Sequence, residues 1–471
     1  MLDKGLVRDV LDQALSKGGD FAEVFAEETA RTMIQYSSNE VEKALSGREY
    51  GVGIRILFGR QSAYAYTNDL SREGLIRGAA VVAAAAPGPP AKAALSMGGD
   101  FDRSSPHGMV LSRPELRGLK VQGVALQEKL ALIEIANREA RAHHTLISQV
   151  QVSYLDEIQH VLIANSDGLW VEDDRVRTRL HMAAVASKGA EKQVGSAGPG
   201  ACQGFELYSG LDIPGIAREA AETAVVMVQA DYAPGGKMAV IIDKGFGGVI
   251  FHEACGHSLE GYAVSRKASV FAEKLGQEVA SPLVNVVDDG TLENTWGSTR
   301  VDDEGVPTER TLLIERGILR SFMLDRLSGR ILGLRSTGNG RRQSYRFAPV
   351  SRMRNTFILP GTSRLQEMIE ATPAGLYAKK MGGGSVNPAT GEFNFAVMEG
   401  YLIHEGKIEK PVRGATLIGN GKEILHNIDM VGDELQLEPG MCGAASGSVP
   451  TTVGQPVIRV QGLVVGGRGR N

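Results

Sequence analysis

The sequence predicts an α+β protein whose two halves differ in texture. Up to about residue 231, segments with helical spacing of apolar residues alternate with strand-like runs, so we expect an N-terminal α/β half with antiparallel strands and long helices. After that point, short β-like runs follow one another, separated by Gly or Asp. Glycine makes up 59 of the 471 residues, against an average of ~7%, and the excess lies mostly in this second half. A mostly-β C-terminal domain, built as a curved sheet or barrel, is therefore predicted.

Residues 1–86 have the pattern of an N-terminal α/β domain. A helix is expected at 2–16, and Ser71 is placed to cap a second helix at 72–86. Between the helices, the runs that alternate in polarity predict strands at 22–28, 32–37, 51–58 and 62–67. Residues 87–118 are rich in Pro, Gly and Ser and have the composition of a linker.

Residues 119–231 are expected to form a central α+β segment packed with the N-terminal domain. Helices at 121–142 and 213–229 flank its strands. Those strands are predicted at 147–154, 159–165, 169–176 and 177–187. Residues 232–471 are expected to form the C-terminal β-rich domain. Its predicted strands are 238–242, 283–288, 311–315, 318–324, 356–359, 396–404, 407–412 and 457–465. No internal repeat of fixed period is visible.

Composition excludes several classes of protein. The formal net charge is -4, without the basic excess of a dedicated nucleic-acid binder. The three cysteines lie far apart, at 202, 255 and 442, which does not make a disulfide framework and fits a reducing compartment. The first residues predict an amphipathic helix rather than a signal peptide, and no apolar stretch of ~18 residues predicts a membrane span. We expect a cytoplasmic protein with no membrane contact and no direct nucleic-acid partner.

One short motif in the C-terminal domain carries chemistry. His252 and His257 flank Glu253; two neutral imidazoles suit zinc, and the glutamate can take a proton from a water molecule at the metal. The familiar zinc-peptidase motif places its histidines four residues apart, whereas here the spacing is five. Residues five apart point about 140° away from each other on a regular α-helix. We therefore predict an irregular helix, such as one with a π-bulge, eased by Gly256. Spacing alone leaves open a buried helix with an unrelated pair of histidines.

The blocks around this motif resemble the TldD/PmbA family of metallopeptidases. The catalytic branch of that family carries His-Glu-Ala-x-Gly-His-x-x-Glu, which here runs from His252 through His257 to Glu260. The further similar blocks keep the family's order and span most of 232–471. They are 269–272, 288–291, 302–305, 336–345, 441–443 and 454–456. The N-terminal half is compatible with the family but less distinctive.

The resemblance implies a set of site residues. His252, His257 and Cys442 would hold one zinc ion per catalytic subunit, and Glu253 would act as general base and later as proton donor. Two His and one Cys leave a fourth position for water, as in catalytic zinc sites. Without the resemblance, Cys442 would be interpreted as a small buried apolar residue. Cys255 is not a ligand position in the family, and a packing role is expected for it.

Other residues of the motif blocks have two interpretations each. Glu260 either holds an imidazole by its free N–H or is a solvated helix carboxylate. Arg341 and Arg342, with Tyr345, either bind a peptide carboxylate or an oxyanion or form a surface basic pair. The acidic run 302–304 either forms a calcium-like oxygen cluster or is a solvated turn, and the second is preferred.

Two departures from the family pattern concern polar contacts. Tyr262 stands where some members have Asp, which puts a charged role at that position in doubt. After Cys442 and Gly443, the family often continues with Lys and Gln, but this chain has small residues at 444–447. The contacts that the family's longer side chains make are therefore absent or replaced.

The function implied by the resemblance is that of a zinc-dependent peptidase acting on short or unfolded peptides inside an enclosed dimer cavity. The dimer would be a homodimer or a heterodimer with a PmbA-like subunit. A non-catalytic regulatory or peptide-binding subunit is the alternative within the family, although such a subunit should lack the His252-Glu253 pair. A metal hydrolase acting on another amide is a third reading, because the site chemistry is the same.

Overall fold

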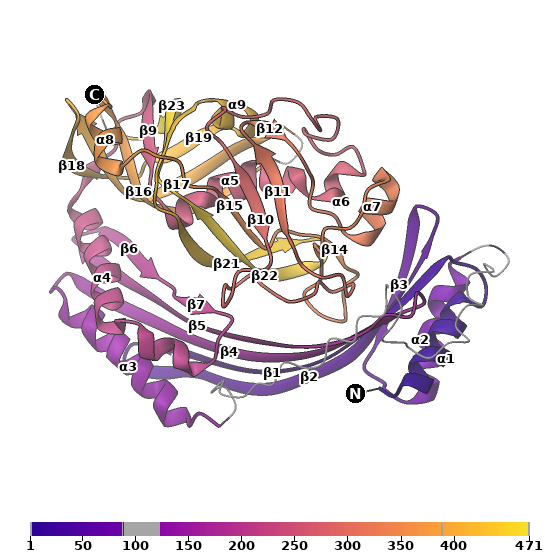
Figure 1. Ribbon diagram of the computed structural model, residues 1–471. Helices are drawn as coiled ribbons and strands as arrows, with labels where there is room; N and C mark the ends of the chain where they lie inside the picture. Colours follow the sequence, from indigo (N-terminus) through magenta and orange to yellow (C-terminus); the bar gives the residue numbers. More distant parts are fainter. Residues whose placement is uncertain (1, 87, 89–122, 388–389, 470–471) are drawn as a thin grey trace.

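A long curved sheet forms the base of the molecule, and the C-terminal domain lies against its concave side (Figure 1). The computed structural model describes residues 2–86, 88, 123–387 and 390–469. Except for residue 88, the predicted linker at 87–118 lies outside the described residues. No described helix combines the length and the apolar character needed to cross a membrane.

The base sheet is antiparallel and has the strand order β3-β2-β1-β4-β5-β6, with β7 paired to β5. Its centre is the long pairing of β1 with β4. The same order of helix, three strands and helix occurs on both sides of this pairing, apart from β7 and a short 3-10 turn before α4. The elements are α1 (Lys4–Leu15), β1 (Phe21–Ser37), β2 (Glu40–Phe58), β3 (Gln61–Thr67), α2 (Arg72–Ala84), α3 (Leu126–Ala142), β4 (Ile147–Asn165), β5 (Trp170–Lys188), β6 (Glu191–Ala197), β7 (Gly200–Ala201), η2 (Phe205–Gly210) and α4 (Ile213–Gln229).

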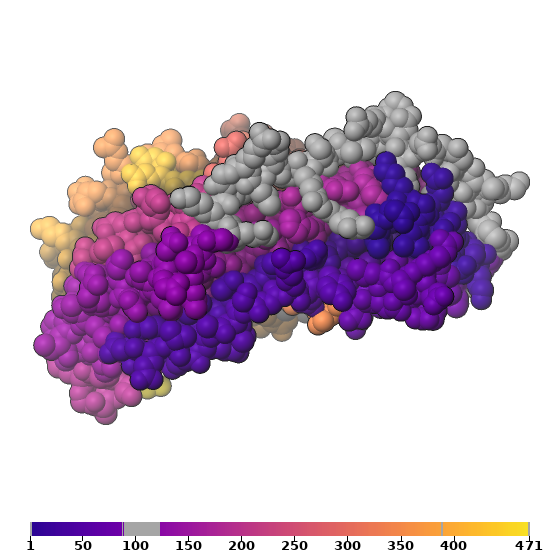
Figure 2. All heavy atoms as spheres, turned by 90° about the horizontal axis from the view of Figure 1, so that it is seen from below, coloured from indigo at the N-terminus to yellow at the C-terminus, as the bar shows by residue number. Residues whose placement is uncertain are grey.

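Two helix pairs cover one face of this sheet at opposite ends. Val24 and Ile54 pack in a core with α1 and α2, whereas Ile34 and Tyr154 pack in a second core with α3 and α4. Val24 and Ile34 are an even number of residues apart in β1, so both point to the same face. Seen from below, the strands and the two helix pairs form this surface of the molecule (Figure 2).

The sequence prediction divided strands that are continuous in the structure. The expected strands at 22–28 and 32–37 are both part of β1, and β4 and β5 each join two expected strands in the same way. Thr29, in the gap, pairs with Glu49 of β2 and Gln159 of β4. The polar residues around Thr29 indicated a turn. In the structure this part of β1 is covered by neither helix pair, and its backbone pairing with β2 and β4 continues the strand.

The C-terminal domain contains a closed ring of strands, which confirms the barrel-like prediction. The ring runs β16-β9-β23-β19-β17 and closes through the pairing of β16 with β17; β18, β8 and β20 extend it. These strands are β8 (Asp231–Tyr232), β9 (Gly236–Ile242), β16 (Ala374–Val386), β17 (Glu392–His404), β18 (Lys407–Arg413), β19 (Thr416–Asn420), β20 (Ile428–Val431) and β23 (Ile458–Gly466).

A second sheet packs beside the ring, and its edge strand carries Cys442. The order is β12-β11-β10-β15-β22-β21, so among the described strands β21 pairs only with β22. The strands are β10 (Val286–Asp289), β11 (Arg310–Glu315), β12 (Ile318–Leu319), β15 (Asn355–Ile358), β21 (Gln436–Ala444) and β22 (Gly447–Gln455). A separate short pair is β13 (Gly340–Arg341) with β14 (Val350–Ser351). The helices of this domain are α5 (Val249–Ala254), α6 (Gly261–Val264), α7 (Arg326–Leu332), α8 (Leu365–Glu370) and α9 (Gly421–His426), with 3-10 turns η3 (Gly245–Gly248) and η4 (Gly256–Leu259).

Buried charges join the base sheet to the C-terminal domain. Arg55 of β2 forms ion pairs with Glu23 of β1, at 2.9 Å, and with Glu304 of the C-terminal domain. In the same layer, Arg175 of β5 pairs with Asp303 at 2.5 Å. Arg342 reaches back to Glu23, and all six side chains are buried. We name Glu23, Arg55, Arg175, Asp303, Glu304 and Arg342 the domain-joining cluster.

The domain-joining cluster corrects the prediction of a solvated turn at 302–304. Asp303 and Glu304 are paired with arginines of the base sheet, and Asp302 accepts hydrogen bonds from backbone N–H groups, including those of Glu304 and Gly340. Their oxygens are used in this way rather than gathered around a common point, so the calcium-like alternative is wrong as well. We propose the domain division expected from the sequence, at 1–86, 119–231 and 232–471, with the first two segments sharing one sheet.

Candidate metal centre

The helix that carries the first histidine ends before the second. α5 ends at Ala254, Cys255 leaves helical geometry with φ -127° and ψ -44°, and the 3-10 turn η4 then carries His257. The change of helix type brings the rings of His252 and His257 to a centroid separation of 5.1 Å. An irregular helix is therefore confirmed, but the expected π-bulge is wrong, because the α-helix stops and a tighter turn replaces it.

Gly256 packs closely against the side chain of Met353. A Cβ atom at this position would lie 2.3 Å from Sδ of Met353, closer than any real contact. The absence of a side chain lets η4 pack directly against the segment that follows β14. His257 follows directly after this close contact, in η4.

Cys442 reaches both histidines from the edge strand β21. Its Sγ lies 3.1 Å from Nε2 of His252 and 3.3 Å from Nε2 of His257, although 190 and 185 residues separate these positions in the chain. Each of the three side chains offers one ligand atom, and these atoms lie within 4.8 Å of one another. We name His252, His257 and Cys442 the metal cluster.

The donors of the metal cluster fit zinc in kind and in spacing. Zinc bonds of ~2.3 Å to sulfur and ~2.0 Å to nitrogen in a tetrahedron place S and N about 3.5 Å apart, close to the distances found here. Burial raises the pKa of the Cys442 thiol, but hydrogen bonds to His252 and His257 outweigh this effect and lower it to about 5. The sulfur is therefore a thiolate at neutral pH, which is the form that binds metal.

The two imidazoles have different surroundings. Nδ1 of His257 lies 3.0 Å from Oε2 of Glu260, as in the carboxylate–histidine pairs that orient metal ligands. Burial lowers the pKa of His257, but Glu260 and Cys442 outweigh it and raise the pKa well above its usual value. A metal ion and this proton compete for the same ring. Nδ1 of His252 is buried and has no hydrogen-bond partner among the described residues.

Glu260 is buried, so the alternative of a solvated carboxylate is wrong. Besides contacting His257, it accepts a hydrogen bond from the backbone N–H of Met353 at 3.1 Å. Burial raises the pKa of Glu260, but the charge and hydrogen bond of His257, the charge of Arg352 and the backbone N–H of Met353 outweigh it and lower the pKa. Glu260 therefore lies directly behind one imidazole as a charged carboxylate.

Glu253 lies next to the metal cluster but is more open to solvent. Its Oε2 is 3.8 Å from Nε2 of His257, and 32% of its side chain is exposed, against 16% for His257. A carboxylate at the rim of a cluster of metal-binding donors is placed to exchange protons with a reacting water.

The structure separates the residues predicted around 341–345. Arg341 is buried and donates to the carbonyl oxygens of Met353, at 2.6 Å, and Pro450, at 2.7 Å. Arg342 belongs to the domain-joining cluster, and the backbone N–H of Tyr345 donates to Glu27 of the base sheet. The surface basic pair is therefore wrong, because both arginines are buried. We do not propose substrate contacts for Arg342 and Tyr345, since their polar groups serve the domain interface.

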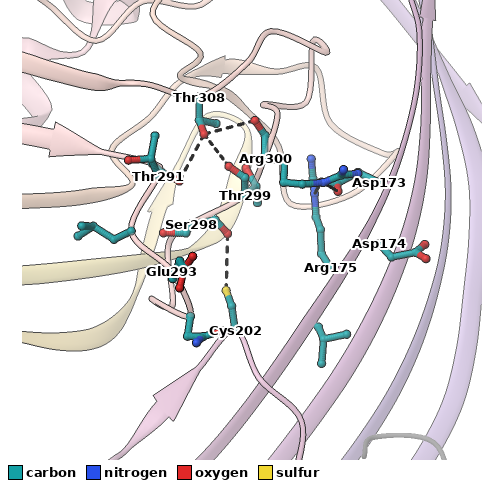
Figure 3. Close-up of a pocket in the computed structure, with 14 residues that line it drawn as sticks. Asp173, Asp174, Arg175, Cys202, Thr291, Glu293, Ser298, Thr299, Arg300 and Thr308 are labelled. Carbon is teal, nitrogen blue, oxygen red and sulfur yellow. Dashed lines mark hydrogen bonds and ion pairs between the residues drawn. The ribbon is translucent and has the colours of Figure 1, made fainter. Parts of the chain in front are cut away.

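The other two cysteines lie apart from the metal cluster. Cys255 is fully buried, with Sγ 3.3 Å from the carbonyl oxygen of Gly421, which fits a packing role. Cys202 faces a separate pocket of about 570 Å³ between β5 and the segment 290–308 (Figure 3). There its Sγ lies 3.6 Å from the carbonyl oxygen of Ser298.

Sequence reasoning missed Arg352, which contacts both Glu260 and the backbone of Cys442. Nothing in its sequence context marks it, because it is one of several arginines in this stretch, with others at 341, 342, 346 and 354. Arg352 can be distinguished from the neighbouring arginines only in the folded structure, where η4 and β21 bring Glu260 and Cys442 to it.

The sequence matches the models of three consecutive domains of one protein family. PmbA/TldA metallopeptidase domain 1 matches residues 22–86, the central domain matches 120–228, and the C-terminal domain matches 235–467.

Proteins with similar sequences carry metalloprotease names. A metalloprotease TldD homolog from Haemophilus influenzae is 38% identical over 428 residues, which are 88% of this chain and 86% of that protein. A zinc metalloprotease TldD homolog from Saccharolobus solfataricus is 29% identical over 342 residues, 72% of this chain and 76% of that protein. The crystal structure of TldE from Thermococcus kodakarensis has the same fold, with a TM-score of 0.74 and 20% identity over 98% of this chain and 99% of that chain.

Proposed function

Because this chain belongs to the PmbA/TldD family of metallopeptidases, we propose that it is a zinc-dependent peptidase in which His252, His257 and Cys442 hold one zinc ion. The observation that carries this proposal is the meeting of a thiolate and two imidazoles beside Glu253, from segments far apart in the chain. The choice of zinc rests on the donor set and agrees with the name of the Saccharolobus relative.

The chain's own residues have separate tasks in peptide hydrolysis. Zinc, when bound, supplies Lewis acidity that polarises the scissile carbonyl and lowers the pKa of water. Glu253 accepts a proton from the attacking water and delivers it to the leaving amine as the C–N bond breaks. Glu260 holds His257 by Nδ1, which keeps Nε2 of that ring directed at Cys442.

We extend the proposal to substrate and assembly. The substrates are short or unfolded peptides, which enter a cavity enclosed by a dimer, and the partner is a second copy or a PmbA-like subunit. The two-subunit pattern implied by the family resemblance supports this assembly, and the cytoplasm is the proposed location. A non-catalytic subunit is disfavoured, because the chain carries Glu253 together with the complete set of donors.

Metal analysis of purified variants tests the site. The parent is expected to contain zinc near one ion per chain, and Cys442→Ser and His252→Ala are each expected to lose it. Cys202→Ser is the matched control, because this cysteine faces a separate pocket and should leave the zinc content unchanged. If zinc stays at parental levels in both cluster variants, the assigned ligands are wrong. Digestion of a peptide library by the parent then distinguishes a peptidase from a hydrolase of another amide.

A further inference from the structure

One arginine bridges the two elements that carry His257 and Cys442. Arg352 follows β14 and is completely buried. Its Nη2 donates to the carbonyl oxygen of Cys442 at 2.5 Å, and its Nε lies 3.6 Å from Oε1 of Glu260. Oε2 of Glu260 lies 3.0 Å from Nδ1 of His257, so Glu260 lies between Arg352 and that imidazole. Arg352 is also hydrogen-bonded directly to the backbone of Cys442.

The same guanidinium also holds the turn between β21 and β22. Nη1 donates to the carbonyl oxygen of Gly447 at 2.9 Å and to Oγ of Ser446 at 3.2 Å. β21 is an edge strand, so within the described part of the chain backbone pairing supports Cys442 from β22 alone. Ser446 lies in the segment that departs from the family pattern, and its hydroxyl gives this arginine an acceptor there.

We propose that Arg352 is a positioning residue that holds His257 and Cys442 at metal-binding distance from each other. The inference rests on the proposed function, since it takes His252, His257 and Cys442 as the ligands. A buried carboxylate needs a buried counter-charge, and Arg352 supplies it for Glu260. Its two Nη atoms donate to the β21–β22 turn and to the carbonyl of Cys442, while its charge faces the carboxylate behind His257 without a hydrogen bond to it.

Replacing Arg352 by lysine tests whether its positive charge is sufficient or whether its several hydrogen bonds are needed. Arg352→Lys keeps the positive charge, but one ammonium cannot reach Glu260, the Cys442 carbonyl and the β21–β22 turn together. Loss of such orienting contacts typically lowers metal affinity about 10- to 100-fold. We expect a loss of this size in zinc affinity, measured by competition with a chromophoric chelator. We also expect shifted absorption bands for the Co(II)-substituted protein, because these bands report ligand geometry.

Arg354→Lys is the matched control. Arg354 is also buried, but its side chain donates to the carbonyl oxygen of Gly338 and to Oγ1 of Thr299, which lie outside the metal cluster. Its lysine variant is expected to melt at a lower temperature than the parent while keeping parental zinc affinity and Co(II) bands. Ser446→Ala removes one acceptor of Arg352 with little strain and should weaken zinc binding several-fold.

Several outcomes overturn the inference. Parental zinc affinity and Co(II) bands in Arg352→Lys do so, as does an equal loss of affinity in Arg354→Lys. If Arg352→Lys does not fold, Ser446→Ala decides, and unchanged affinity in that variant counts against the role. Retention of zinc by Cys442→Ser refutes the proposed function itself, whereas loss of zinc there with no effect of Arg352→Lys refutes only the positioning role.

Discussion

The metal cluster and the domain-joining cluster are both buried and polar, but their members are matched differently. In the domain-joining cluster, each carboxylate faces an arginine, and three of the four pairs cross from the base sheet to the C-terminal domain. In the metal cluster, three electron-pair donors face one another, and Nδ1 of His252 has no partner among the described residues. Opposite charges that meet hold two domains in place, whereas donors that converge create an affinity for a cation.

The comparison predicts that changes at the metal cluster affect catalysis and that changes at the domain-joining cluster affect folding. Substitutions of Glu253, beside the metal cluster, and of Arg55, in the domain-joining cluster, test this separation. Glu27, which also lies at the domain interface, gives a smaller effect that depends on pH.

Glu253→Gln should lower peptide hydrolysis by about 10²- to 10⁴-fold, because the amide cannot accept the proton of the attacking water. Zinc content should stay at the parental level, and the melting temperature should hardly change, since the side chain is one-third exposed. Rates are measured on a peptide that the parent cleaves. Glu273→Gln, at an exposed position outside the cluster, serves as control. A Glu253→Gln enzyme that cleaves at the parental rate contradicts the assignment of the base.

Arg55→Met should lower the free energy of unfolding by about 3–5 kcal/mol, because it leaves Glu23 and Glu304 buried without this partner. Urea unfolding measures the loss, and zinc per folded chain should remain parental. Arg48→Met is the control in the same strand, since its ion pair with Glu28 is exposed and is worth about 0–1 kcal/mol. Equal effects of the two substitutions would show that the buried pairs do not hold the domains together.

Glu27→Gln should change how stability depends on pH. Burial raises the pKa of Glu27 from 4.5 to about 7, so the folded state favours its neutral form. Its contribution to stability is fully present below the unfolded pKa of 4.5 and is lost as pH rises to about 7, because in this range the folded chain keeps a proton that the unfolded chain has released. An uncharged amide removes this dependence.

The stability of Glu27→Gln relative to the parent should therefore increase between pH 5 and pH 8, by at most about 3 kcal/mol. Thermal unfolding of both proteins at the two pH values measures the difference. The sign is unaffected by a constant cost from the new amide beside Gln159, because that cost is the same at both pH values. A stability difference that does not change with pH would mean that Glu27 is ionised in the fold throughout this range.

Local signals explain the elements that were predicted well. The helix expected at 213–229 coincides with α4, because the Asp212 side chain caps it and Pro214 occupies its first turn. The expected breaks inside β1 and β4 were wrong, because polar residues in mid-strand resemble a turn until the paired strands are known. In the site, the five-residue spacing predicted an irregular helix, but not that the α-helix ends at Ala254 and that Gly256 then lies close against Met353.

By itself, the sequence determined the class of fold and the pair of histidines beside Glu253, because periodicity and short motifs are local properties of a chain. The five-residue spacing of these histidines also excluded a regular α-helix that directs both side chains at one ion. Only the tertiary structure decided that Cys442 approaches both imidazoles, that Arg352 lies behind two ligands, and that Arg342 belongs to a domain interface. Those relations join residues far apart in the chain, and the packing of β21, η4 and the base sheet sets their distances.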